Sequence, residues 1–340
     1  MKPARLRPYR LVEIVLLILL PGCLAAALPA VAAAATSYRV IPASGPRLMW
    51  QNGDGYCGEV SLQVAGIQLG FWVGQNQARK LAGGEALLGV NYDTLLGKLH
   101  LSYSDWSGGT AATDRQNFMD WIRDGLMTGY PVIFGAKTHD TWGTDPDYDH
   151  IMIADAVTTS QAVGGGYNAA DTMSYADGID GTENTLTFDQ WVNGSTNVNQ
   201  YYYLPPKATV VLSNGKKVKC NGYQYGVMIT GVAGASECRP VSMTPVTPKS
   251  ESNVTQGGTS STMNATVTMS GLTAGTTYTL LRWDCTYKTI GSVPFSNFLR
   301  SATSANVVSR FTATGPTATC NVTFMSDGVT FFRCCAGTVS

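Results

Sequence analysis

Hydrophobic residues in the first part of the chain, 45–205, recur at helical spacing and later at strand spacing. After Cys57 the apolar residues stand at i, i+4 and i+7, the spacing of a helix that buries one face. We predict helices that begin at Cys57 and that span 93–101 and 115–127. We predict strands at 131–135, 151–154, 172–175, 186–188 and 201–204. Helices followed by an antiparallel sheet make an α+β domain.

From about residue 245 the pattern changes to short alternating runs between Thr, Ser and Gly turns. These runs predict strands at 262–269, 276–283, 308–314, 319–325 and 329–333. Their regular spacing is typical of a β-sandwich. The stretch 245–258 is typical of a linker, and 206–244 predicts a bridging hairpin that turns at Asn214-Gly215. The expected segments are therefore 1–35, 36–205, 206–248 and 249–340.

The first 35 residues have the pattern of a secretory signal. Basic residues at 2–10 precede a wholly apolar run at 14–20 and an alanine-rich stretch that ends at Ala35. Leu20-Pro-Gly-Cys23 also resembles a bacterial lipoprotein box, which is the alternative interpretation. No long apolar segment follows, so we expect a secreted mature chain with no membrane span.

Charge makes nucleic acid an unexpected partner. The chain has 23 Lys and Arg and 23 Asp and Glu, of which four and one lie in 1–35, so 19 basic and 22 acidic residues follow. A formal charge of −3 without a basic cluster does not favour phosphate binding.

Eight cysteines become seven once Cys23 is removed with the signal, so at least one thiol has no partner within the chain. We expect Cys57 to be free, Cys220 to pair with Cys238, and the remaining four to pair within the C-terminal region. Surface glycosylation is expected at four Asn-x-Ser/Thr sequons. The sequons are at Asn193, Asn253, Asn264 and Asn321.

Cys57 stands in Gln51-Asn-Gly-Asp-Gly-Tyr-Cys-Gly-Glu59, directly after turn-forming residues and at the start of a predicted helix. The free N–H groups and the positive end of the helix dipole favour a thiolate there, which is the state of a nucleophilic cysteine. His150 heads an apolar strand-like run and can act as the base. His139 is the fallback base, and His100 is expected to be structural.

These residues resemble the papain-like cysteine peptidase superfamily over 48–205. Gln51 lies six positions before Cys57, the offset of the oxyanion-hole glutamine in that family, and Asp149-His-Ile-Met-Ile-Ala-Asp155 resembles the strand with the catalytic histidine. Asp177 stands where the bacteriocin-leader-peptidase branch has its aspartate, although no Asn-Ser-Trp motif is present. Gly271-Leu-Thr-Ala-Gly-Thr-Thr-Tyr278 resembles the turn and tyrosine of fibronectin type III-like domains.

The resemblance implies a papain-like domain with Cys57 as nucleophile, His150 as base, Asp177 as the group that orients the base, and Gln51 in the oxyanion hole. Three other residues compete with Asp177 for its role: Asp171, Asn168 and Asn184. The expected activity is peptide-bond hydrolysis on a peptide or protein substrate. The alternatives are an inactive papain-like binding module and a thiol amidase or acyl transferase.

No cofactor or metal is implied by this interpretation. The acidic residues Asp140, Asp145, Asp147 and Asp149 could suggest calcium, but they lack the glycine and the distal glutamate of an EF-hand, so we interpret them as a solvated loop. The C-terminal sandwich could bind a cell-surface or matrix ligand, because such domains more often act as binding modules or spacers than as catalysts.

Overall fold

The computed structural model describes residues 34–43, 45, 47–49, 55–84, 91–106, 112–137, 149–194, 197–198, 209–211, 217–219, 226–232, 238–247 and 261–339. The helices are α1 (Cys57–Leu69), α2 (Gln75–Ala82), α3 (Tyr92–Lys98), α4 (Ala112–Met127), α5 (Phe188–Asn193) and α6 (Phe298–Ser301), with 3₁₀ turns η2 (Ile290–Ser292) and η3 (Ser304–Asn306). These helices accompany antiparallel sheets, so the predicted α+β class is confirmed. The signal segment up to residue 33 and the strand predicted at 201–204 lie outside the described residues.

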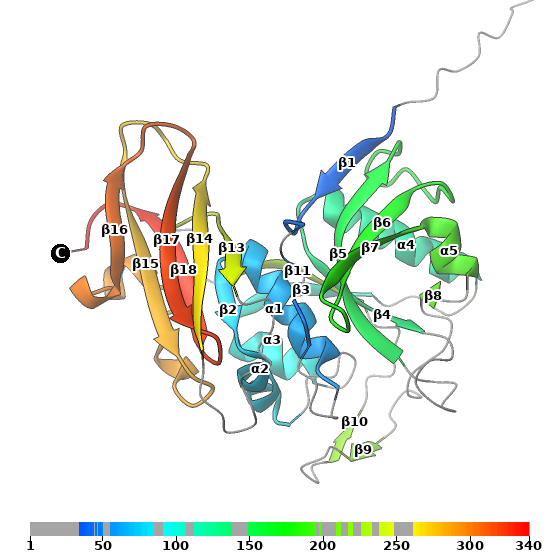
Figure 1. Cartoon of the computed structure of the whole chain (residues 1–340), viewed down its shortest axis with the longest axis horizontal. Coiled ribbons are helices and arrows are strands. Elements are labelled where there is room, and N and C mark those ends of the chain that lie inside the picture. The colour runs from blue at the N-terminus through cyan, green and yellow to red at the C-terminus, as the bar shows by residue number, and fades with distance from the viewer. Residues whose placement is uncertain are drawn as a thin grey trace, which may run out of the picture. The chain divides into compact units, whose positions relative to one another are not determined.

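One antiparallel sheet combines a strand that precedes α1 with strands that follow the first helices (Figure 1). Its strands are β1 (Thr36–Arg39), β3 (Leu101–Asp105), β4 (Val132–Lys137), β5 (Asp149–Thr159), β6 (Thr172–Asp177), β7 (Thr182–Thr187), β8 (Asn197–Val198) and β11 (Gly226–Val232). The order is β3-β11-β4-β5-β6-β7, with β1 paired to β5 and β8 paired to β4. The long strand β5 therefore has neighbours along both edges.

Two further sheets pack face to face as a β-sandwich. One contains β12 (Cys238–Arg239), β15 (Thr277–Cys285), β16 (Val307–Thr312), β18 (Val329–Ala336) and β2 (Phe71–Val73). The other contains β13 (Val241–Thr247), β14 (Thr262–Ser270) and β17 (Thr317–Met325). Apolar residues that alternate along these strands, such as Val267, Leu280 and Phe332, form a shared core.

Tyr278 closes the turn that precedes β15. Its hydroxyl accepts a hydrogen bond from the backbone N–H of Thr273 at 3.0 Å, five residues upstream. That is the geometry of a tyrosine corner. The predicted β-sandwich is therefore present, while its fibronectin type III-like kinship stays a prediction.

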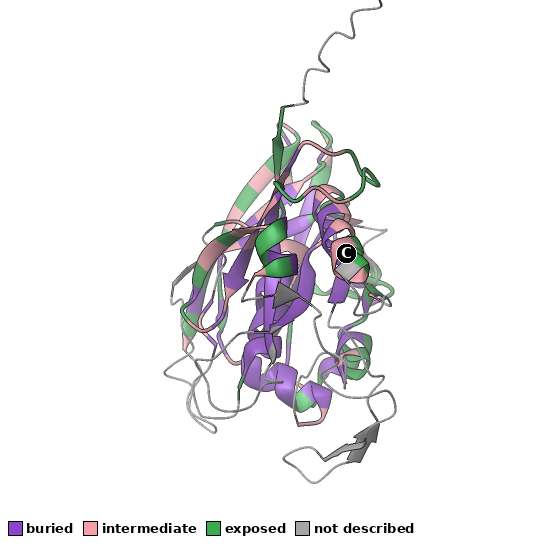
Figure 2. Ribbon diagram, turned by 90° about the vertical axis from the view of Figure 1, so that its right-hand side faces the viewer, coloured by how far each residue is buried: buried purple, intermediate pink, exposed green. Residues whose placement is uncertain are grey.

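Strand β2 joins the segment after α1 to the sandwich. Phe71, Trp72 and Val73 pair with the first residues of β18, next to the position where β12 pairs with the same strand. α1 contacts β5 on one side and β13 on another. Residues 57–67 of α1 are accordingly buried all round, rather than along one stripe as the spacing predicts. Buried positions fill the interior in Figure 2, and exposed ones lie on outer strands and turns.

Several element boundaries differ from the prediction. The helix predicted to reach Leu101 ends at Lys98, because His100 adopts a left-handed φ of 52° and Leu101 begins β3. Phe188 begins α5 instead of closing a strand, since Thr187 and Gln190 form a reciprocal capping box. The predicted linker from Pro245 begins inside β13, an edge strand whose register shifts at that proline.

The bridging segment contains two paired elements. β9 (Thr209–Val211) and β10 (Lys217–Lys219) form the expected hairpin, with its Asn214-Gly215 turn outside the described residues. β11 then pairs with β3 and β4 in the first sheet. The domain limits themselves stay predictions.

The expected disulfide pattern is wrong for Cys238. It bonds Cys335, which lies directly opposite it on β18 and 97 residues away in sequence, so the local pairing with Cys220 is not formed. Cys57 is free, as expected. The other free cysteines among the described residues are Cys285, Cys320 and Cys334, so the pairing expected within the C-terminal region is wrong as well.

Candidate functional site

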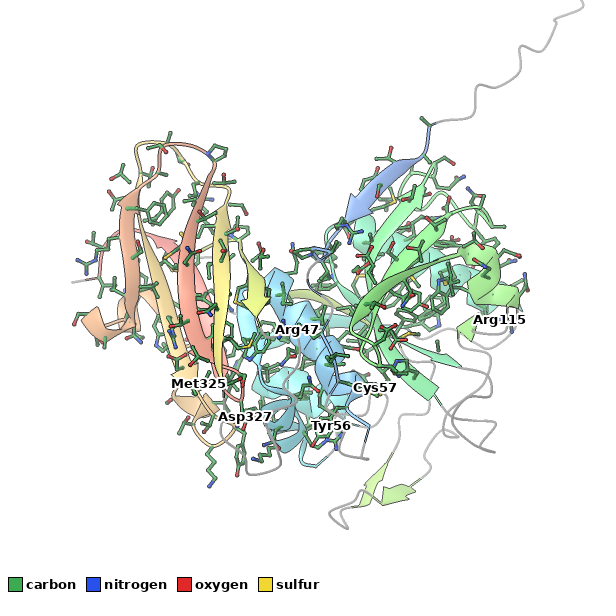
Figure 3. The ribbon with its side chains drawn as sticks, in the orientation of Figure 1. Arg47, Tyr56, Cys57, Arg115, Met325 and Asp327 are labelled. Atoms are coloured by element: carbon green, nitrogen blue, oxygen red, sulfur yellow. A yellow bond between two sulfur atoms is a disulfide. The ribbon has the colours of Figure 1, made fainter. Side chains whose placement is uncertain are left out.

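Cys57 is the first residue of α1, as the sequence predicts, and Figure 3 shows it at the start of that helix. The first helical hydrogen bond runs from the N–H of Val60 to the carbonyl of Tyr56. The N–H of Cys57 donates no hydrogen bond to any described residue. A backbone donor and the positive end of the helix dipole therefore face the same space as the thiol.

His150 lies beside this helix end because β5 begins there. The residue pairs with Ala136 of β4, and the hydroxyl of Ser61 on α1 approaches the carbonyl of Ile151 at 3.4 Å. The imidazole is fully buried. Its Nε2 lies 2.8 Å from Oδ1 of Asp177.

The other ring nitrogen, Nδ1, is buried and makes no hydrogen bond of good geometry with a described residue. Nδ1 is therefore the ring nitrogen that is available to the Cys57 thiol. Burial lowers the pKa of His150, but hydrogen bonding to Asp177 and to the Cys57 thiol, with their charges, outweighs burial and raises it to about 9. At that pKa the imidazole carries a proton at neutral pH, which it could give to a leaving group.

Asp177 ends β6 and begins a tight turn. Its Oδ1 accepts the N–H of Ile179 at 2.8 Å, and its carbonyl accepts the N–H of Gly181 at 2.9 Å. Burial raises the pKa of Asp177, yet its hydrogen bond and charge pairing with His150 prevail and lower the pKa below its usual value. The carboxylate is thus ionised and fixed in direction, which suits a group that orients a base.

The same turn holds the segment that leads toward Gln51. The N–H of Met49 donates to the carbonyl of Gly178 at 2.6 Å. A Cβ on Gly178 would lie 2.5 Å from Cγ1 of Val60 on α1. Gln51 itself lies outside the described residues, so its oxyanion-hole role stays a prediction.

Buried polar residues that the sequence did not point to lie on α1 and α2. Gln75 of α2 donates to the carbonyl of Leu48 at 2.9 Å, and Gln63 of α1 donates to the carbonyl of Val73 at 3.0 Å. Glu59 and Arg79 form a buried ion pair at 2.6 Å. No sequence signal marks these residues, because their partners lie in other elements.

The competing candidates lie elsewhere. Asp171 accepts from Thr159 at 2.6 Å and from Asn168 at 2.7 Å, and Asn184 donates to Thr182 at 3.2 Å. Among the four candidates, the geometry brings Asp177 to His150. The fallback base His139 lies outside the described residues.

His100 is exposed at the end of α3 and stacks on Phe295 with ring centroids 4.0 Å apart. It contacts no candidate site residue in a described interaction. The described residues contain no group of three or more His, Cys, Asp or Glu that could hold a metal. Of the predicted acidic loop, 140–147 lies outside the described residues. No helix in the described part of the chain has the length and apolarity needed to span a bilayer.

A scan against protein-family models found no match to this chain, and a search of curated proteins found no significant match.

Proposed function

We propose that this protein is a secreted thiol hydrolase that cleaves peptide bonds with Cys57, His150 and Asp177, and that its fold is papain-like. The contact of 2.8 Å between His150 and Asp177 carries this proposal, because it leaves the second imidazole nitrogen available to Cys57. Acyl transfer needs a nucleophile, a base beside it and a third group that orients the base. The signal pattern at 1–35 supports action outside the cell.

In the first half-reaction the Cys57 sulfur attacks the substrate carbonyl carbon and forms a C–S bond. The oxyanion that develops accepts a hydrogen bond from the backbone N–H of Cys57, and Gln51 is proposed as the second donor. The His150 imidazolium gives its proton to the leaving amine, the C–N bond breaks, and a thioester remains.

In the second half-reaction water replaces the amine. His150 accepts a proton from water, the hydroxyl attacks the thioester carbonyl, and the C–S bond breaks to regenerate the thiolate. Asp177 stays ionised throughout and holds the imidazole in one orientation. The products are a carboxylic acid and an amine.

A peptide-library screen of wild type beside Cys57→Ala tests this mechanism. We expect hydrolysis from wild type and none from Cys57→Ala, with Cys320→Ser as the matched control because Cys320 is also free but lies on β17 in the sandwich. Hydrolysis that survives Cys57→Ala, or none by wild type, contradicts the proposal. Products that incorporate an added amine instead of water would identify an acyl transferase.

A further inference from the structure

Arg79 contacts the chain on both sides of Cys57. From α2, its Nε donates to Oε1 of Glu59 at 2.6 Å, and a terminal nitrogen donates to the carbonyl of Gly55. Its guanidinium lies over the Tyr56 ring, 3.5 Å from the centroid. One side chain thus holds two residues before Cys57 and one residue after it.

The segment before Cys57 needs such support. Gly55 has a left-handed φ of 60°, and Tyr56, the N-cap of α1, makes no side-chain capping hydrogen bond. Tyr56 is nonetheless fully buried. The planar guanidinium can stack on a ring and bond a carboxylate and a carbonyl at once, which an ammonium group cannot reproduce.

α2 is itself held by the turn between β17 and β18. Gln77 donates to the carbonyl of Asp327 at 3.2 Å and to its Oδ1 at 3.4 Å, while the N–H of Gly74 donates to the carbonyl of Gly328 at 2.8 Å. Figure 3 labels Asp327 in this turn, with Tyr56 and Cys57 at the start of α1. The C-terminal sandwich therefore fixes the start of the helix that carries Arg79.

We propose that Arg79 is a positioning residue for the Cys57 nucleophile, and that the β17–β18 turn of the sandwich keeps it in place. This inference rests on the proposed function for its catalytic meaning. Arg79 balances the buried negative charge of Glu59 two residues from the thiol, and it fixes the backbone that aims the thiol at His150. The sandwich then has a supporting role for the site, in addition to any ligand-binding role of its own.

The two roles of Arg79, balancing the charge of Glu59 and fixing the backbone before Cys57, predict different outcomes. Without Arg79, the Glu59 carboxylate loses its arginine, and its negative charge in the first turn of α1 opposes formation of the Cys57 thiolate, so alkylation of Cys57 should shift to higher pH. Without stacking and the bond to Gly55, the thiol is aimed less well and alkylation slows at every pH. Four variants separate these effects: Arg79→Lys, Arg79→Met, Glu59→Gln/Arg79→Met and Asp327→Ala.

The experiment measures iodoacetamide alkylation of Cys57 by peptide mapping across pH, in the full chain with Cys320→Ser. Arg79→Met is expected to raise the pH of half-maximal rate by about one unit and to slow the plateau rate. Glu59→Gln/Arg79→Met should return the midpoint toward wild type but keep the slow plateau. Arg79→Lys should keep the midpoint and slow the plateau, and Asp327→Ala should do so more weakly.

Arg282→Met is the matched control, because it removes a partly exposed arginine–aspartate pair from the sandwich. It should leave both midpoint and plateau at wild-type values. A folded Arg79→Met or Arg79→Lys variant that alkylates with the wild-type midpoint and plateau overturns the proposal. If Arg79→Met does not fold, Arg79→Lys decides by its plateau rate. Altered alkylation in the Arg79 variants together with no peptide hydrolysis by wild type would contradict the proposed function but leave the positioning role of Arg79 supported.

Discussion

Nε2 of His150 lies 2.8 Å from Oδ1 of Asp177, although 27 residues separate them. The contact forms because β5 and β6 pair antiparallel, with Ile153 opposite Ala176, so that Asp177 reaches back toward the start of β5. The turn after Asp177 directs its carboxylate inward. A strand pairing thus sets the orientation of the candidate base.

Asp177→Asn keeps an oxygen near Nε2 but removes the negative charge. The pKa of His150 should fall from about 9, since ionic stabilisation of the imidazolium is lost. Below its pKa the imidazolium is present, and above it the protonated fraction falls about tenfold per pH unit. The alkaline limb of peptide hydrolysis, which needs the imidazolium as proton donor, should therefore move to lower pH.

Asn184→Ala is the control for that experiment, because Asn184 lies on β7 and bonds Thr182. It should leave the pH profile of hydrolysis in place. An unchanged alkaline limb in folded Asp177→Asn protein would show that the carboxylate does not act on His150.

Gly178→Ala should disturb the same contact by sterics alone. The added methyl would meet Cγ1 of Val60 at 2.5 Å and Cβ of Met49 at 3.3 Å, so the turn must shift. We expect a loss of about 1–3 kcal/mol in the free energy of unfolding and slower hydrolysis. Urea denaturation and kinetics measure both.

A second substitution sharpens this test. Val60→Ala removes the contacted methyl groups, so Gly178→Ala/Val60→Ala should lose less than the two single variants added together. Gly291→Ala is the matched control, because a Cβ there meets nothing within 4 Å. Strict additivity of the pair would argue against the clash.

The helix at Cys57 could be predicted from sequence because its signals are local. Turn residues precede it, and apolar residues follow at helical spacing. His150 and Asp177 could be proposed through the family resemblance, and the geometry brings them together. Their catalytic roles and the oxyanion role of Gln51 stay predictions.

Other features depend on contacts that local patterns do not encode. α2 has the polar sequence QNQARKLA, yet most of it is buried because its side chains find partners on α1 and on the β17–β18 turn. Strand β2 has three residues, too few for a periodic signal, and pairs with β18 more than 250 residues later. The capping box at Thr187 and Gln190, by contrast, is a local sequence signal. It indicates a helix start at Phe188 and therefore the end of β7 at Thr187.

Trp72→Ala should destabilise the sandwich, although Trp72 precedes the predicted sandwich segment 249–340 in the sequence. Trp72 of β2 is fully buried, donates from Nε1 to the carbonyl of Ser326 at 2.9 Å, and packs on Phe324 with ring centroids 5.3 Å apart. Truncation should cost about 3–5 kcal/mol of unfolding free energy. Because β2 follows α1 directly, near-UV circular dichroism and Cys57 alkylation should report the same transition. Two separate transitions would show that sandwich and site unfold independently.

Asp155 should make stability depend on pH. Its side chain is fully buried on β5, and neither carboxylate oxygen makes a hydrogen bond of good geometry with a described residue. Burial, then the charge of Glu183, raises the pKa of Asp155 to about 8, although Arg39 opposes this. Arg39 of β1 binds both oxygens of Glu183, at 2.6 and 2.8 Å, so the pair lies where β1 joins the sheet.

The sign of the effect follows from proton binding. The unfolded chain loses this proton near pH 3.8, whereas the folded chain keeps it to about pH 8. Unfolding therefore releases a proton in that window, and the free energy of unfolding falls as pH rises, by at most about 1.4 kcal/mol per pH unit. Asp155→Asn removes this dependence, so its advantage over wild type should grow from pH 4 to about pH 8 in urea denaturation. Asp284→Asn, an exposed carboxylate on β15, should show no such growth. A constant difference between Asp155→Asn and wild type across the window would mean that Asp155 ionises in the folded chain as readily as in the unfolded one.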